Sequence, residues 1–245
     1  MNISFKRVRA LTHYELISEA KLITIILFVM FLVEIIMLSF FGELEFSDIK
    51  DVSKNWLGMT MFMLAICTTA RYLRPAQTTA YTTLPGSSAE KFMAQVSLYL
   101  IIMAAVTLLR LGILEIVGFV TNNTFSVIDV FLDVPLDLKE FPFSEEQIAT
   151  YHHICCYTHF CYFILFAMIN AIIRFLSGTI RRVGYIILLP IGIISSSFGL
   201  LPMVHAYNYT NSTWFQHTPW LTIFIVLTLL SGWLYYKSFS KVQAN

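Results

Sequence analysis

Six apolar segments, each of about the length that a helix needs to cross a bilayer, dominate this sequence of 245 residues. Spanning the hydrocarbon core takes about 20 consecutive apolar residues as helix. The segments are residues 22–41, 56–73, 92–120, 153–173, 183–204 and 219–236. They leave no room for a separate soluble domain. The sequence therefore predicts an all-α polytopic membrane protein with six transmembrane helices, in which residues 1–245 form a single transmembrane domain.

The distribution of charge along the chain predicts its orientation. Only 13% of the residues are charged, and most of the cations fall before the first segment, after the last, or in the even-numbered loops. These cations are Lys6, Arg7, Arg9, Lys21, Arg71, Arg74, Lys91, Arg174, Arg181, Arg182, Lys237 and Lys241. Because excess Lys and Arg marks the cytoplasmic side, both termini are predicted to be cytoplasmic. Residues 121–151 then form an acidic outer loop.

The start of the chain is typical of a membrane anchor. Residues 1–20 are polar and the first apolar run has full span length without a small-residue cleavage site, so no cleavable signal peptide is expected. The four cysteines, Cys67, Cys155, Cys156 and Cys161, form no C-x-x-C pair. They therefore indicate neither a disulfide scaffold nor a zinc ribbon.

Residues 4–20 have the pattern of an N-terminal amphipathic helix. Phe5, Val8, Leu11 and Leu16 fall loosely on one helical face, and cations gather near the start. This pattern predicts an interfacial helix on the inner leaflet. The alternative is a plain cytoplasmic extension of the first span.

A helix-start signal precedes the third span. Pro85 and Gly86 end the preceding structure, and Ser87-x-x-Glu90 forms a capping box, in which each side chain accepts a hydrogen bond from the other residue's backbone N–H. The third span therefore begins in water. Its apolar run to Val120 gives roughly 29 residues, or about 43 Å of helix, at 1.5 Å per residue. Since the hydrocarbon core is only about 30 Å thick, this helix is expected to protrude or tilt.

The segment between the second and third spans, residues 71–88, is too polar to cross a membrane. Pro75 is suited to the start of a helical turn, and Tyr72, Leu73, Tyr81 and Leu84 offer apolar contacts. The pattern fits a short surface helix, and an ordinary ordered loop is the alternative.

The phrase Leu84-Pro85-Gly86-Ser87-Ser88-Ala89-Glu90-Lys91-Phe92, together with the basic N-terminal helix and the six-span layout, resembles the membrane (permease) subunits of type-2 ABC transporters of the small bacterial form. The resemblance implies that residues 4–20 are the connecting helix and that residues 71–90 are a cytoplasmic loop that couples the spans to an ATPase. The residues expected to serve this coupling are Arg71, Arg74, Pro75, Tyr81, Pro85, Ser87 and Glu90.

The same resemblance implies the partners. The chain has no G-x-x-x-x-G-K-[ST] phosphate loop, so ATP and Mg are expected in a separate ABC ATPase subunit and no cofactor in this chain. A second permease copy or a paralogous permease would complete an exporter in the bacterial cytoplasmic (inner) membrane. The lipid bilayer is the other partner, and no nucleic acid is expected. The acidic loop 121–151 departs from the family pattern.

Three charged residues fall well inside apolar segments, away from their ends. Glu34 lies in the first span, and Arg110 and Glu115 lie in the third. An ionised side chain in hydrocarbon is costly unless it finds water or a partner. An ion pair between Glu34 and Arg110 is one hypothesis; Glu115 competes as the partner, and snorkelling of Arg110 to the outer interface is the alternative.

A His/Cys cluster lies at residues 151–161. On a helix, His152, Cys155 or Cys156, and His159 share one face, and their ligand types suit zinc or copper. The spacing is permissive only, because such residues are ordinary at the outer end of a span. No metal site is therefore predicted.

The rival function is a non-transporting membrane sensor or assembly partner that uses the outer loop and the His/Cys cluster. An adjacent reading frame with a phosphate loop favours the permease, and an adjacent kinase or metal-resistance gene favours the sensor. An enzyme is not predicted, because the sequence has no G-x-S-x-G and no H-E-x-x-H motif. Asn122, Asn208 and Asn211 begin N-x-[ST] sequons on the predicted outer face. They would be glycosylated in a eukaryotic secretory pathway, and in a bacterial chain, which the resemblance implies, they are polar loop residues.

Overall fold

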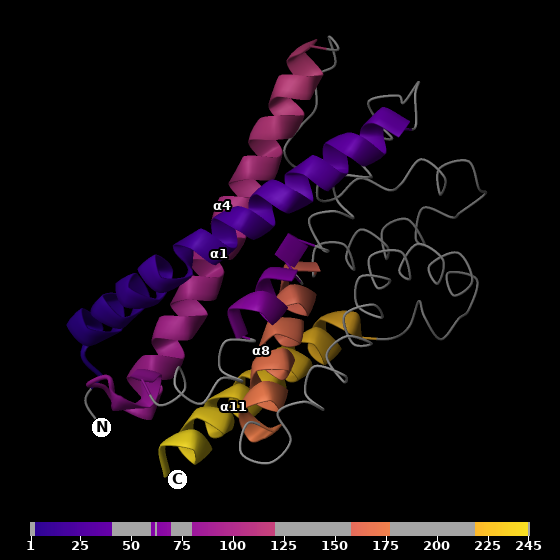
Figure 1. The fold of residues 1–245 in the computed structure, drawn as a ribbon. Helices are drawn as coiled ribbons and strands as arrows, with labels where there is room; N and C mark the ends of the chain where they lie inside the picture. Colours follow the sequence, from indigo (N-terminus) through magenta and orange to yellow (C-terminus); the bar gives the residue numbers. More distant parts are fainter. Residues whose placement is uncertain are drawn as a thin grey trace.

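The structure, a computed structural model, describes residues 3–40, 60–61, 63–69, 80–120, 158–176 and 219–244. All regular secondary structure in this part of the chain is helical. The long helices are α1 (Phe5–Phe40), α4 (Ser88–Val120), α8 (Thr158–Leu176) and α11 (Trp220–Ala244), shown in Figure 1. Residues 80–83, and the described residues between 60 and 69, are also helical. The all-α fold class is thus confirmed for the described residues.

Three helices are long and apolar enough to cross a membrane. The stretches Phe5–Val33, Ser88–Ile116 and Leu221–Lys241 each contain an apolar run of sufficient length. The apolar part of α8, Tyr162–Phe175, is shorter. The predicted span 183–204 lies outside the described residues, and 56–73 is described only in part. The structure therefore supports an integral membrane protein with three candidate spans, and the count of six stays a prediction.

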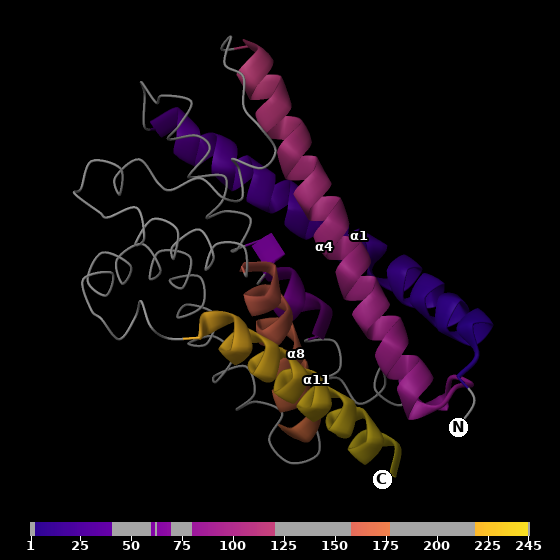
Figure 2. The same ribbon diagram turned by 180° about the vertical axis from the view of Figure 1, so that it is seen from behind.

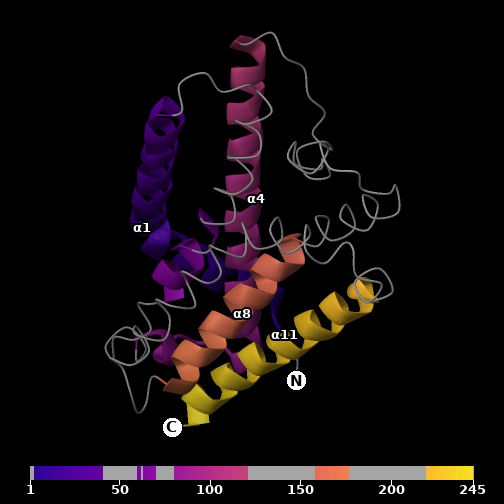
Figure 3. The same cartoon turned by 90° about the vertical axis from the view of Figure 1, so that its right-hand side faces the viewer.

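Helix α1 runs without a break through the predicted junction between the N-terminal helix and the first span. It has 36 residues and contains no Gly or Pro that would end it. The Ser4 carbonyl oxygen accepts from the backbone N–H groups of Arg7 and Val8, both at 3.0 Å, at its start. Figure 3 shows that the first part of α1 runs in a different direction from the rest. The two predicted elements are thus one continuous helix.

The long helices form two packed pairs, α1 with α4 and α8 with α11. Helix α1 contacts α4, and α11 contacts both α8 and α4. Figures 1 and 2 show this arrangement from opposite sides, with the two chain termini at the same end of the molecule. Side chains from all of these helices and from the described residues between 60 and 69 fill one core, which includes Ile26, Met61, Tyr99, Phe166 and Tyr235.

The outward faces of the long helices are apolar. Phe28 of α1, Leu108 of α4 and Leu229 of α11 are each more than half exposed, and many neighbours on the same faces are aliphatic. Soluble monomers rarely expose apolar patches this extensive. These faces are those expected of helices that contact lipid.

Candidate functional site

The start of α4 is held by the predicted capping box. The Ser87 backbone N–H donates to Glu90 Oε2 at 3.0 Å, and the Glu90 backbone N–H donates to Ser87 Oγ at 3.3 Å. Two of the donors that a helix N-terminus leaves without an intrahelical partner are thereby satisfied. The capping box is confirmed, and α4 begins at Ser88 as this local chemistry requires.

The same Glu90 carboxylate also binds the start of α1. Arg7 Nη2 and Nε lie 2.9 and 3.0 Å from Glu90 Oε1, and the Ser4 backbone N–H donates to Oε1 at 2.8 Å. The Glu90 side chain is 1% exposed, whereas that of Arg7 is 55% exposed. One buried carboxylate therefore joins the beginning of α1, the loop at Ser87 and the first turn of α4.

These donors fix the charge of Glu90. They lower the pKa of its carboxyl from 4.5 to about 2, chiefly through the Arg7 side-chain hydrogen bond and then through the Ser4 and Ser87 N–H groups, while burial opposes the shift. Glu90 lies in the first turn of α4, ahead of the apolar run that begins at Phe92. Negative charge at a helix N-terminus is further favoured by the helix dipole. The link is therefore ionic at neutral pH.

Gly86 allows the loop to approach α1 closely. Its φ is +157°, a conformation that L side chains rarely adopt. A Cβ at this position would lie 3.2 Å from Leu11 Cδ1. Leu11 also packs with Val8 and Ala94 in a small apolar cluster between α1 and α4. The glycine predicted only as a helix breaker thus also serves interhelical packing.

Lys91 and Tyr81 tie residues 80–83 to α4. Lys91 is buried, and its Nζ donates to the Thr82 carbonyl oxygen at 2.7 Å. The Tyr81 hydroxyl donates in return to the Lys91 carbonyl oxygen at 3.2 Å. Lys91 Nζ also lies 5.8 Å from the centre of the Tyr81 ring, within reach of a cation–π interaction. Residues 80–91 consequently form one connected unit.

One turn further along α4, Gln95 connects three helices. Its Oε1 accepts from the Tyr235 hydroxyl of α11 at 2.9 Å and from Arg174 Nη2 of α8 at 3.3 Å. The Arg174 guanidinium carbon lies 3.8 Å from the centre of the Phe239 ring. All four side chains are buried. A polar network therefore continues from the start of α4 into α8 and α11.

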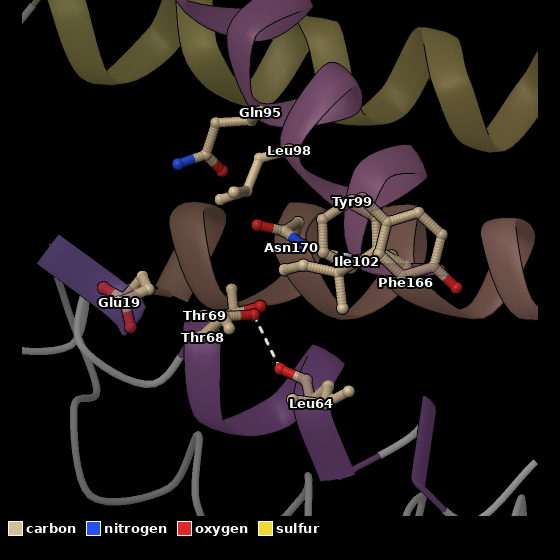
Figure 4. A pocket seen from close by; sticks show the side chains of 10 residues that line it. All are labelled: Glu19, Leu64, Thr68, Thr69, Gln95, Leu98, Tyr99, Ile102, Phe166 and Asn170. Atoms are coloured by element: carbon tan, nitrogen blue, oxygen red, sulfur yellow. Dashed lines mark hydrogen bonds between the residues drawn. The ribbon is translucent and has the colours of Figure 1, made fainter. Parts of the chain in front are cut away.

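A small cavity lies between α1, α4, α8 and residues 64–69 (Figure 4). Its volume is about 10 Å³, which is room for about one water molecule. The Asn170 side-chain N–H donates to the Phe166 carbonyl oxygen at 3.0 Å, and among the described residues Asn170 Oδ1 has no hydrogen-bond donor. The Thr68 and Thr69 hydroxyls donate to carbonyl oxygens of their own helix. The cavity is suited to an ordered water and is too small for a transported solute. Its lining residues are Glu19, Leu64, Thr68, Thr69, Gln95, Leu98, Tyr99, Ile102, Phe166 and Asn170.

The predicted coupling residues fall into three groups. Arg71, Arg74 and Pro75 lie outside the described residues. Tyr81, Ser87 and Glu90 make contacts within the chain, and Tyr81 and Glu90 are buried. Pro85 is exposed at the surface of the loop. The described residues are thus suited to hold the loop in place, with Pro85 available to a partner.

The predicted intramembrane residues are only partly described. Arg110 is buried and Glu115 is exposed. The Glu34 side chain lies outside the described part of the structure, although its backbone belongs to α1. The Glu34–Arg110 ion pair therefore stays a prediction.

The His/Cys cluster is largely outside the described residues. His152, Cys155 and Cys156 precede α8, and His159 lies within α8 but its side chain is not among those described. Among the side chains that are described, no three His, Cys, Asp or Glu residues gather closely enough to hold a metal. Cys67 is a free thiol.

The sequence alone did not predict the distant partners of Glu90 and Gln95 near the start of α4. Arg7 and its partner Glu90 are 83 positions apart in the sequence. Gln95 and its partner Tyr235 are 140 positions apart. No local pattern reports such distant partners. A signal was nevertheless present for Gln95 and Arg174, because each is a polar residue in or at the end of an otherwise apolar run.

No family model, no curated protein and no solved structure matches this chain.

Proposed function

We propose that this protein is the permease subunit of an ATP-driven ABC exporter and that residues 71–90 couple a separate ATPase to the membrane helices. The observation that carries the proposal is the Glu90 carboxylate, which binds the loop at Ser87 and the first turn of α1 at Ser4 and Arg7. A force applied to the loop would act on two long helices at once. The phrase at residues 84–92 supports the same assignment.

The rest of the arrangement follows from this proposal. The chain would cross the inner membrane of a bacterium six times with both termini in the cytoplasm. Two copies, or one copy and a paralogous permease, would enclose the substrate path, because six spans are half of what a two-ATPase exporter normally encloses. ATP and Mg would bind in the partner, since this sequence has no phosphate loop.

The contacts around residues 80–95 support a mechanical role for this segment. Lys91 and Tyr81 fasten residues 80–83 to α4, and Gln95 links α4 to Arg174 and Tyr235. Packed side chains and hydrogen-bond networks of this kind carry coupling between sites. Movement of the loop by the ATPase would therefore shift α1 and α4 first, and α8 and α11 through Gln95.

The test is affinity purification of the tagged chain from native membranes in mild detergent, with identification of partners by mass spectrometry. Thr83 and Pro85 are exposed on the loop, so the variant Thr83→Arg/Pro85→Arg blocks docking while leaving the buried contacts of Tyr81 and Glu90 in place. Glu115→Arg, exposed towards the far end of α4, is the matched control. A variant with residues 78–86 replaced by a Gly/Ser run removes the loop altogether.

The expected result is an ATPase with a phosphate loop that copurifies with the native chain and with Glu115→Arg, and that is lost from both loop variants. Retention of the ATPase by the two loop variants would contradict coupling through this loop. Absence of any such ATPase from the intact native chain would remove the transporter assignment.

A further inference from the structure

The first half of α1 separates its acids from its bases. Glu15 and Glu19 are buried against the rest of the protein, whereas Lys6, Arg9 and Lys21 are exposed. At about 100° per residue the two sets occupy opposite faces of the helix. The outward face of this segment therefore carries net positive charge, because its carboxylates are turned inward.

Apolar side chains share this outward face. Lys6, Arg9, His13, Ile17 and Lys21 follow one another at spacings of three or four residues and form a single stripe, which we call the outward stripe. Ile17, in the middle of this stripe, is 63% exposed.

Aromatic rings flank the outward stripe: Phe5 is 77% and Tyr14 is 48% exposed. Cations mixed with exposed aromatic and aliphatic side chains are typical of a helix in contact with lipid headgroups.

The length of α1 places this segment near the headgroups. Its 36 residues give roughly 54 Å of helix, while the hydrocarbon core takes up only about 30 Å, or about 20 residues. About four turns remain, which matches residues 5–20 ahead of the predicted span. Figure 3 shows this part of α1 turning away from the direction of the rest.

The outward stripe is also continuous with an apolar face of the span. Beyond Lys21, the residues Ile25, Phe28 and Leu32 are exposed at the same helical spacing. These side chains are expected to contact acyl chains. Lys21, the cation of the outward stripe nearest to these apolar residues, is therefore expected at the depth where the acyl chains end and the headgroup phosphates lie.

We propose that the outward stripe binds the headgroups of anionic phospholipids in the leaflet that lies at the end of the molecule with the chain termini. Lys6, Arg9 and Lys21 contact the lipid phosphates, and Ile17, Phe5 and Tyr14 enter the interface between headgroups and acyl chains. Arg7 takes no part, because its guanidinium binds Glu90. This lipid site does not depend on a partner ATPase.

The test uses the full-length protein in nanodiscs of equal amounts of phosphatidylglycerol and phosphatidylcholine. Lipids that remain bound after gentle extraction are counted by native mass spectrometry for the native chain and for Lys6→Gln/Arg9→Gln. The matched control is Lys237→Gln/Lys241→Gln, which removes two exposed cations from α11 at the same end of the molecule. Thermal unfolding in detergent confirms that each variant is folded.

Each cation near an anionic surface contributes roughly a fivefold preference. The enrichment of phosphatidylglycerol over phosphatidylcholine is therefore expected to fall by about tenfold or more in Lys6→Gln/Arg9→Gln. It is expected to fall much less in the α11 control, because Lys237 Nζ and Lys241 Nζ lie over the Trp233 and Phe175 rings and are less available to lipid phosphates. Equal losses in both variants would show a general charge effect and overturn the proposal. An unchanged preference in Lys6→Gln/Arg9→Gln would overturn it as well.

Discussion

Arg7 Nη2 lies 2.9 Å from Glu90 Oε1, although the two residues are 83 positions apart in the sequence. The contact brings the first turn of α1 against the first turn of α4. Because Glu90 also accepts from Ser4 and Ser87, the two ends of this ion pair are not equivalent. Among the described residues, the half-exposed Arg7 has one partner of opposite charge, whereas Glu90 is buried and accepts from several donors.

The two partners are therefore expected to differ in their effect on stability. Glu90→Gln removes the negative charge that Arg7 and the backbone N–H groups share, and it should lower the Tm more than Arg7→Gln, whose partner keeps its backbone donors. For Arg7→Gln we expect a fall of about 1–3 °C, as for a partly exposed ion pair. Thermal unfolding in detergent measures both. Equal falls would show that the backbone contacts of Glu90 contribute nothing.

The low pKa of Glu90 predicts a pH dependence of stability. Its folded pKa, about 2, lies below the ordinary value of 4.5, so its stabilising contribution is fully present above about pH 4.5 and is lost as the pH falls towards 2. The Tm difference between the native chain and Glu90→Gln should therefore be constant from pH 7 to about 5 and shrink below that. A difference that is unchanged at pH 3 would contradict the ionic link.

Gly86 and Gly112 are predicted to respond oppositely to the same substitution. Gly86→Ala places a Cβ 3.2 Å from Leu11 Cδ1 in a conformation that favours glycine, and should destabilise by about 1–3 kcal/mol. At Gly112, inside α4, a Cβ meets nothing within 4 Å, so Gly112→Ala should stabilise by about 0.5–1 kcal/mol. Chemical unfolding in detergent compares the two. A neutral Gly86→Ala would exclude a close approach of this loop to α1.

The hydrogen bonds to Gln95 predict that two substitutions lower the free energy of unfolding by different amounts. Tyr235→Phe removes one donor to Gln95 Oε1 and should cost about 1 kcal/mol. Gln95→Leu removes the acceptor shared by Tyr235 and Arg174, so it should cost more, about 1–3 kcal/mol. The free energy of unfolding in detergent gives both values, and Tyr236→Phe, at an exposed position one residue away, is the control. The reverse order would show that Gln95 is not the centre of the network.

How far the sequence predicts this structure depends on the range of the interaction. The capping box at Ser87 and Glu90 spans three residues, so local chemistry was sufficient to predict it. The apolar runs likewise predicted α4 and α11, because a span depends on its own composition. The contact between Arg7 and Glu90 was not predictable, since it depends on how α1 packs against α4.

The predicted boundary near residue 20, between the N-terminal helix and the first span, is not a helix end in the structure, where α1 runs from Phe5 to Phe40. The change from polar to apolar composition there predicts a junction between an interfacial helix and the first span, with a plain extension of that span as the alternative. Both compositions are compatible with a helix, and no Gly or Pro interrupts residues 5–40, so the helix continues while its surroundings change. Burial of Glu15 and Glu19 was also unexpected, because charge alone does not report which face a helix turns inward.

The most direct test of the coupling role is site-specific photo-crosslinking in native membranes. A benzoylphenylalanine replaces either Pro85, exposed on the loop, or Phe119, exposed near the opposite end of α4. We expect irradiation to link position 85 to an ATPase that contains a phosphate loop, and position 119 to give no such product. An ATPase adduct from both positions, or from neither while the chain is intact and folded, would contradict the assignment of residues 71–90 as the element on which the ATPase docks.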